Sequence, residues 1–166
     1  MEALYYQDAT VKDLPEIVTI YNSVIAGRMV TADLTPVTVE SKEAWFKEHT
    51  PERRPLWMIK NGEKTTVGWA SFQDFYGRPA YNGTAEISIY LHPDFRGKGH
   101  GKRVLQYCID QSPALNITTL LGYIFAHNKP SLKLFTQLGF EEWANMPDIA
   151  ELDGIKRTLK ILGRRV

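Results

Sequence analysis

The stretch Arg96-Gly97-Lys98-Gly99-His100-Gly101 decides the fold of this chain. It follows an apolar run over residues 85–91 and precedes an apolar stripe at helical spacing over residues 104–109. The glycines therefore stand where a strand ends and a helix begins. Backbone N–H groups at a helix N-terminus are unpaired and carry about half a positive charge, to which the neighbouring lysines and arginines add full charges. The pattern predicts a binding site for a phosphate group.

The common nucleotide-binding loops do not fit this stretch. A P-loop needs Gly-x-x-x-x-Gly-Lys-Ser/Thr, but Arg96 stands at the position of the first glycine and Arg103 follows Gly101-Lys102. The dinucleotide fingerprint also fails, because Lys102 stands where its third glycine belongs. The remaining pattern is Arg-x-x-Gly-x-Gly at a strand-to-helix junction. A basic surface turn without a ligand is the alternative interpretation.

Composition narrows the class of protein. The 166 residues form one domain of common size, 1–166, and 43% hydrophobic with 23% charged residues is ordinary for a globular chain. A formal net charge of +1 gives no reason to expect a nucleic-acid or membrane partner. The single cysteine, Cys108, excludes an internal disulfide, and with an N-terminus that lacks a signal or membrane segment it predicts a cytoplasmic protein. His92, His100 and His127 show no metal-ligand spacing, so no metal is expected.

Hydrophobic periodicity predicts an alternation of strands and helices. Expected strands cover residues 4–6, 56–59, 66–75, 85–91, 118–125, 140–143 and 157–162, and expected helices cover residues 14–25, 41–46, 100–111 and 131–138. The strands on either side of helix 100–111 should be parallel, because a crossover helix joins them. The early hairpin, which turns at Asn61-Gly62, should be antiparallel. These elements predict a mixed sheet with helices on both faces.

Four segments between residues 85 and 140 resemble the motifs of the GCN5-related N-acetyltransferase (GNAT) family. They are the strand ending at Ile89-Tyr90-Leu91-His92-Pro93, the loop 96–102, Asn128 with Ser131, and Leu138-Gly139-Phe140. The resemblance implies an α/β (α+β) fold with a mixed, largely antiparallel central sheet and a parallel β-α-β core that binds acetyl-CoA. It further implies that the end of the first of these strands bulges and exposes backbone groups, one of which stabilises the thioester oxygen.

The same resemblance implies which residues contact acetyl-CoA. They are Ile89, Tyr90, Leu91, Arg96, Gly97, Lys98, Gly99, His100, Gly101, Lys102, Asn128 and Ser131. Asn128 has an acceptor and two donors that could bridge the pantetheine amides, and its natural structural use is as a helix N-cap. Ser131 likewise could cap the helix or contact the ligand.

Further segments are similar to the phosphinothricin N-acetyltransferase branch. These are Tyr21-Asn22, Trp45, residues 78–86 and the tail 150–164. The branch implies direct transfer, in a ternary complex, from acetyl-CoA to the amine of a small amino acid or analogue such as phosphinothricin or methionine sulfoximine. Its members are commonly homodimers, with a late loop, here Trp143 to Gly154, near the partner's site.

Three upstream residues are the candidates for acceptor chemistry. Glu86 stands in an otherwise apolar strand, where a carboxylate beside the thioester can accept the amine's proton, and its counterpart in the branch is the proposed catalytic base. The alternative is an outward-facing residue in a solvated ion pair. Arg78 can hold a substrate carboxylate with two hydrogen bonds, and Tyr81 can supply a rigid wall to a substrate site. The resemblance implies these roles, because the counterparts of both residues in the branch contact substrate. Both could instead belong to an ordinary polar loop.

One residue departs from the family pattern. Phe135 stands where relatives carry a tyrosine or histidine that can return a proton to the CoA thiolate. The thiolate could leave unprotonated, take a proton from water, or receive one from another side chain. Two alternatives therefore stay open at this point: an acetyltransferase for another amine, such as a polyamine, a peptide N-terminus or an aminoglycoside, and a CoA-binding sensor without catalysis.

Overall fold

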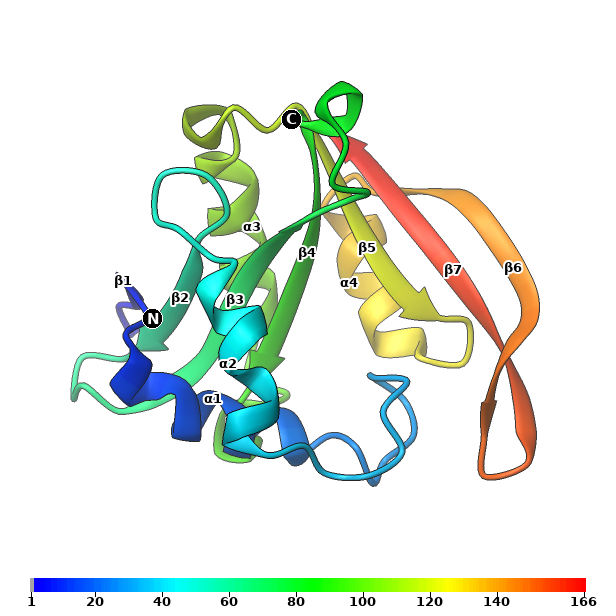
Figure 1. Ribbon diagram of the computed structural model, residues 1–166, viewed down its shortest axis with the longest axis horizontal. Helices are drawn as coiled ribbons and strands as arrows, with labels where there is room; N and C mark the ends of the chain where they lie inside the picture. Colours follow the sequence, from blue (N-terminus) through cyan, green and yellow to red (C-terminus); the bar gives the residue numbers. More distant parts are fainter. Residues whose placement is uncertain (1) are drawn as a thin grey trace.

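A seven-stranded sheet runs through the protein in the order β1-β2-β3-β4-β5-β7-β6 (Figure 1). The computed structural model describes residues 2–166. The strands are β1 (Tyr5–Asp8), β2 (Leu56–Lys60), β3 (Thr66–Asp74), β4 (Thr84–Leu91), β5 (Thr119–Phe125), β6 (Glu141–Leu152) and β7 (Ile155–Arg165). The helices are α1 (Leu14–Asn22), α2 (Val39–Lys47), α3 (His100–Gln111) and α4 (Lys129–Gln137), with single 3₁₀ turns at Val11–Asp13, Pro79–Tyr81, Pro93–Phe95 and Pro113–Leu115.

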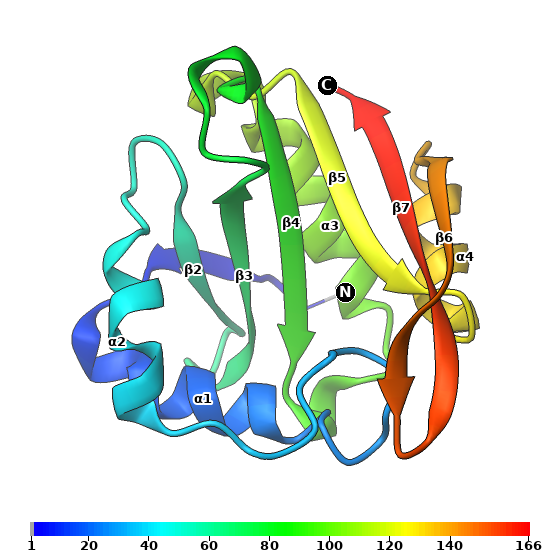
Figure 2. The same cartoon turned by 45° about the vertical axis from the view of Figure 1, so that its right-hand side comes forward.

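Helices cover both faces of the sheet, which confirms the predicted layers (Figures 1 and 2). On one face, Leu14 and Ile17 of α1 pack with Trp69 of β3 in a buried cluster that α2 also covers. On the other face, α3 and α4 pack over a second buried cluster that includes Leu105 and Leu120. The spacing of the apolar residues in each helix therefore predicts which face of the helix is buried. No helix within residues 2–166 is long and apolar enough to cross a bilayer.

Strands β4 and β5 are parallel, as the crossover through α3 predicts, and all other pairings are antiparallel. Their register covers only three pairs, from Thr84↔Thr119 to Glu86↔Leu121. Both strands then continue to Leu91 and Phe125, and Figure 2 shows them moving apart along this stretch. The fold class expected from the sequence is confirmed. The gap between the two strands is the feature that the functional site is built around.

The C-terminal hairpin differs from the expectation. Residues 143–154 were expected as a loop after a short strand, but β6 extends to Leu152 and only Asp153-Gly154 form the turn before β7. The reason is that β6 is the sheet's edge strand, so most of its residues are exposed and no apolar alternation marks it. A register shift between Met146 and Ala150, around Pro147, breaks the two-residue period further.

The first helix is also shorter than its apolar spacing indicates. The helix α1 ends at Asn22, whereas Val24 and Ile25 continue the spacing in the turns that follow. Ile25 is still buried, so the apolar pattern reports burial there and not helix length. The other helix and strand boundaries differ from the expectation by a few residues at most.

Gly122 of β5 makes room for the ring of Phe135 on α4. A Cβ atom built at Gly122 would lie 2.5 Å from Cε1 of Phe135. The ring of Phe135 also packs edge-on against the ring of Phe140, with 4.8 Å between the two ring centres. The phenylalanine therefore has little freedom to move away. The absence of a side chain at residue 122 is a packing requirement of this face of the sheet.

We predict that Gly122→Ala lowers the free energy of unfolding by about 1–3 kcal/mol, because the added methyl overpacks the site of Phe135. Urea denaturation measures this change. The control is Gly62→Ala, whose nearest neighbour would be a Glu2 carboxylate oxygen at 3.9 Å, and it should change stability by less than about 0.5 kcal/mol. Adding Phe135→Leu should recover part of the loss; equal losses with and without that second change would contradict the steric explanation.

Candidate active site

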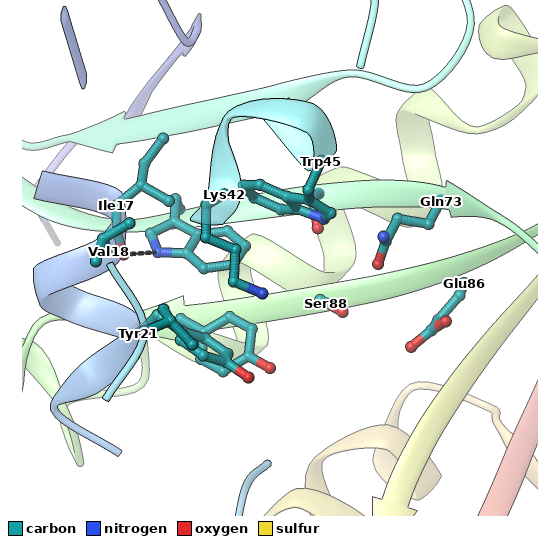
Figure 3. A pocket seen from close by; sticks show the side chains of 12 residues that line it. Ile17, Val18, Tyr21, Lys42, Trp45, Gln73, Glu86 and Ser88 are labelled. Carbon is teal, nitrogen blue, oxygen red and sulfur yellow. Dashed lines mark hydrogen bonds between the residues drawn. The ribbon is translucent and has the colours of Figure 1, made fainter. Parts of the chain in front are cut away.

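A small cavity lies between the sheet and the helices α1 and α2 (Figure 3). Its volume is about 210 Å³. The floor consists of three cross-strand pairs of β3 and β4, namely Trp69↔Tyr90, Ser71↔Ser88 and Gln73↔Glu86. The roof is formed by Ile17, Val18 and Tyr21 of α1, Lys42 and Trp45 of α2, and Val37 before α2. The floor thus changes from aromatic at one end to acidic at the other.

Glu86 lies at the acidic end of this cavity. Burial raises the pKa of its carboxyl from 4.5 to about 7. Within residues 2–166 its carboxylate has no ion-pair partner and no side-chain hydrogen bond, and its cross-strand neighbour Gln73 is neutral. The structure therefore places Glu86 in a cavity and not in a solvated ion pair. A carboxyl with a pKa near neutrality can accept and release a proton at working pH.

A second cavity, of about 220 Å³, occupies the gap between β4 and β5. Residues 87–91 of β4 and 122–124 of β5 line its sides, and α4 contributes Ser131, Leu134 and Phe135. Ser88 and Tyr90 line both cavities. The two cavities therefore meet at β4, at the residues that follow Glu86 on the same face of the strand.

The backbone of β4 presents unpaired groups to this gap. Gly83, just before β4, accepts a hydrogen bond from the N–H of Thr119 on the β5 side at 3.1 Å. Successive residues of a strand direct their N–H and C=O groups to opposite sides. Ile89 and Leu91 therefore face the same side as Gly83, beyond the last pair with β5, Glu86↔Leu121. The N–H and C=O groups of Ile89 and the N–H of Leu91 are available to a ligand with amide and carbonyl groups of its own, whereas the Leu91 carbonyl already accepts a hydrogen bond from Arg96.

The bulge expected near the end of β4 is wrong. The register with β3 runs without a shift from Asp74↔Ala85 to Gly68↔Leu91. The backbone groups are exposed because β5 turns away, and no irregularity of β4 is needed. It follows that Tyr90 directs its backbone toward β3, so that only its side chain reaches the cavities.

The glycine loop has the backbone that its sequence predicts. Gly97 and Gly99 have φ values of +71° and +83°, in the left-handed region that side chains disfavour. Gly99 is the N-cap of α3, so the unpaired N–H groups of the first turn of α3 follow it directly. Gly101 and Arg96 line the gap cavity, and the side chains of Lys98 and Lys102 are exposed. The loop therefore forms a basic end to that cavity.

Two residues of this loop use their side chains for structure. The Arg96 guanidinium donates to the Leu91 carbonyl at 3.0 Å and to the Ser23 hydroxyl at 2.6 Å, which ties the loop to β4 and to the end of α1. His100 is buried, with its ring 5.8 Å from that of Phe95. A contact of His100 with a ligand would therefore come from its backbone.

Asn128 and Ser131 also line the gap cavity. Asn128 is buried and caps α4, since its side-chain oxygen accepts a hydrogen bond from the Ser131 N–H at 3.3 Å. The capping role considered for Asn128 is confirmed. A ligand contact by the rest of its amide group stays a prediction.

The proton-donating residues at the gap differ from the family pattern. Phe135 lines the cavity but has no proton to donate. Tyr123 of β5 lines the same cavity, and burial, with a smaller contribution from the charge of Glu86, raises the pKa of its phenol. Sequence reasoning missed Tyr123. Its position one residue after Gly122, which faces α4, indicates that it points to the opposite face of β5, the face of Glu86.

Arg78 and Tyr81 lie outside both cavities, in the connection between β3 and β4. The buried Arg54 holds this connection, because its guanidinium donates to Asp74 and to the Asn82 carbonyl, each at 2.7 Å. Tyr81 is 43% exposed. The structure therefore does not bring the two predicted substrate contacts into the cavity of Glu86, and their role stays a prediction.

Lys42, Ser71 and Ser88 are cavity residues that the sequence did not identify. The two serines alternate with apolar residues along β3 and β4, but so do many solvent-facing serines. Within residues 2–166, no three His, Cys, Asp or Glu side chains gather as a metal-binding group.

Known proteins are similar to this chain in sequence and in fold. The Acetyltransferase (GNAT) family matches residues 22–140. The chain is 53% identical to the protein named "Putative phosphinothricin acetyltransferase YwnH" of Bacillus subtilis strain 168, over 93% of this chain and 94% of that protein. It is 32% identical to the L-methionine sulfoximine/L-methionine sulfone acetyltransferase of Pseudomonas aeruginosa strain PAO1, over 89% of this chain and 86% of that protein.

Among solved structures, that of a phosphinothricin acetyltransferase from Sinorhizobium meliloti in complex with acetyl-CoA superposes with a TM-score of 0.90. It is 27% identical, and the match covers 98% of this chain and 88% of that one. The chain belongs to the GNAT family of N-acetyltransferases, in its phosphinothricin acetyltransferase-like branch.

Proposed function

We propose that this enzyme transfers the acetyl group of acetyl-CoA directly to the amine of a small amino acid or analogue, of the phosphinothricin and methionine sulfoximine type. The observation that carries the proposal is the position of Glu86. Its carboxyl, with a pKa near 7, faces a small cavity that meets the gap between β4 and β5. The names of the relatives support the same class of acceptor.

The geometry supports a simple division of roles. Acetyl-CoA would lie in the gap, with its pyrophosphate at the glycine loop and its pantetheine arm along the free backbone groups of β4. Glu86 would accept a proton from the acceptor's ammonium, directly or through one water, so that the free amine can attack the thioester carbonyl. The C–N bond forms and the C–S bond breaks, so that CoA leaves as its thiolate and takes up the proton that the nitrogen loses as it becomes an amide. The N–H of Ile89, which faces the gap, would donate a hydrogen bond to the carbonyl oxygen as it gains charge.

The size and charge of the acceptor cavity favour a small zwitterion. Its volume of about 210 Å³ is below the roughly 300–1,000 Å³ that is usual for drug-sized ligands. Its lining carries one carboxylate, Glu86, and one ammonium, Lys42. A polyamine or an aminoglycoside would need several acidic groups, so these alternatives are less well matched.

Direct transfer is also favoured by the position of Cys108. This free thiol lies on the buried face of α3, and burial raises its pKa, so it is neither accessible nor ionised as a covalent carrier would have to be. A reduced, buried cysteine fits the cytoplasmic location that we propose for the enzyme.

We further propose that the enzyme is a homodimer that associates through the β6–β7 hairpin. The strand β6 is an edge of the sheet, and Trp143, Met146 and Ile149 on it are exposed apolar residues. Such an edge favours association with another chain. Asp153 at the hairpin turn forms a 2.7 Å ion pair with Arg28, near Val30 of the gap cavity, so a partner on the hairpin would lie close to the site.

The base assignment predicts a pH dependence. Because Glu86 must be unprotonated to accept a proton, kcat/KM for the acceptor should rise as the pH rises through about 7. Glu86→Gln should lower kcat/KM by roughly 10²–10⁴-fold and remove this limb of the profile. The matched control is Glu43→Gln on the exposed side of α2, which should behave as wild type. An unchanged profile in Glu86→Gln would show that another group is the base.

The raised pKa of Glu86 also predicts an effect on stability. The folded chain holds this proton between pH 4.5 and about 7 while the unfolded chain releases it, so the ionisation of Glu86 increasingly destabilises the fold as the pH rises through this window. Glu86→Gln should therefore be more stable than wild type at pH 8, by on the order of 3 kcal/mol, and should lose this advantage toward pH 4.5. Urea denaturation at several pH values tests this; a difference independent of pH would contradict it.

The dimer proposal predicts a sedimenting mass near twice 19.0 kDa in analytical ultracentrifugation. Ile149→Asp should convert the dimer to a monomer, because it places a charge in the apolar contact. The control is Tyr5→Asp on β1, an exposed residue at the opposite edge of the sheet, which should leave the dimer intact. A wild-type monomer at micromolar concentration would remove the proposal.

A further inference from the structure

Lys42 occupies an unusual position on α2. The residues Val39, Trp45 and Phe46 of this helix pack against the buried cluster of α1 and β3, and Lys42 lies on the same face, three residues before Trp45. The other charged residues of α2 are exposed. A lysine on the inner face of an amphipathic helix gives up part of its hydration, which costs free energy unless the ammonium finds a partner.

Lys42 has no carboxylate as that partner. Within residues 2–166 no acidic side chain lies in ion-pair distance of its ammonium. The ammonium instead lies 5.1 Å from the ring centre of Tyr21 and 5.9 Å from that of Trp45. These ring faces stabilise a cation and fix its position, but they do not neutralise its charge. The cavity therefore contains a positioned positive charge that can still bind an anion.

The floor below Lys42 supplies hydroxyl groups. Ser71 and Ser88 are cross-strand partners, and Figure 3 shows Lys42 extending from α2 over the floor toward Ser88. Ser71 is fully buried, and its hydroxyl has no hydrogen-bond partner in the structure. A buried hydroxyl without a partner is costly and rare in native proteins. An anion between Lys42 and the two serines would give this donor a partner.

The distance between this anion site and Glu86 matches one class of ligand. Ser88 and Glu86 are two residues apart on the same face of β4, which separates them by about 7 Å along the strand. One ligand can place its amine at Glu86 and its carboxylate near Ser88 if one or two atoms separate these two groups. An α-amino acid has this geometry.

We propose that Lys42 binds the α-carboxylate of the acceptor, with hydrogen bonds from the hydroxyls of Ser71 and Ser88, while Glu86 binds the amine. This inference rests on the proposed function and deepens it, because it makes Lys42 the residue that selects amino acids over simple amines. It also moves the carboxylate contact from Arg78, which lies outside the cavity, to α2. The aromatic end of the floor, Trp69 and Tyr90, is left for the acceptor's side chain.

The test compares methionine sulfoximine with its carboxamide, which keeps the amine and side chain but lacks the negative charge. For Lys42→Met, we expect KM for the acid to rise about tenfold to a hundredfold, since a charge-assisted contact is lost. KM for the carboxamide and for acetyl-CoA, and kcat, should change little. Lys42→Arg should restore much of the affinity. The matched control is Lys47→Met on the exposed side of α2, which should behave as wild type.

Each contrary result has a separate meaning. An unchanged KM in Lys42→Met, or an equal increase for acid and carboxamide, would overturn the role of Lys42 while leaving the proposed function intact. A carboxylate-specific increase in Arg78→Met, with none in Lys42→Met, would place the anchor in the β3–β4 connection instead. A wild-type enzyme that acetylates no amino acid but turns over another amine would overturn the proposed function and this inference with it.

Discussion

The separation of the parallel strands β4 and β5 is the constraint on which the rest of the structure depends. After three residue pairs the ladder ends, and the backbone groups of Ile89 and the N–H of Leu91 are left facing a gap. Such groups need hydrogen-bond partners, which a ligand rich in amides can supply. On the face of α4, the ring of Phe135 packs on Gly122 where the strands part. On the other face, the gap meets the cavity of Glu86, which is why one site can hold two substrates.

The segment between α1 and α2 lies along one side of this gap, and polar contacts hold it there. The Tyr21 hydroxyl bonds to Asp33 and Thr31, and His127 bonds to the Arg28 carbonyl at 2.7 Å. Val24 and Val30 from this segment line the gap cavity. Residues far apart in the chain thus converge on the place where acetyl-CoA would lie.

Glu86 and Lys42 give the acceptor cavity opposite charges at two points, and neither charge is neutralised within the described residues. Each costs folding free energy, since burial disfavours the ionised form of Glu86 and Lys42 gives up part of its hydration. Stability alone would favour neutral side chains at both positions. A zwitterionic ligand would satisfy both charges at once, which is the physical reason to treat them as one recognition site.

The sequence by itself determined the local features. The order of strands and helices followed from apolar periodicity, the loop 96–101 from glycines that adopt positive φ, and the importance of Glu86 from a charge inside an apolar strand. These are properties of neighbouring residues, so a single chain reveals them.

Only the tertiary structure decided what depends on long-range pairing. The point at which β5 leaves β4 has no local signal, and a gap and a bulge leave similar unpaired groups, so the sequence suggested the wrong one. The edge strand β6 lacks alternation because its side chains are exposed on both faces along most of its length. The structure places Tyr123 and Lys42 at the cavities and leaves Arg78 outside them, which the sequence did not predict. The reason is that the packing of helices against the sheet, and not spacing along the chain, sets which side chains meet.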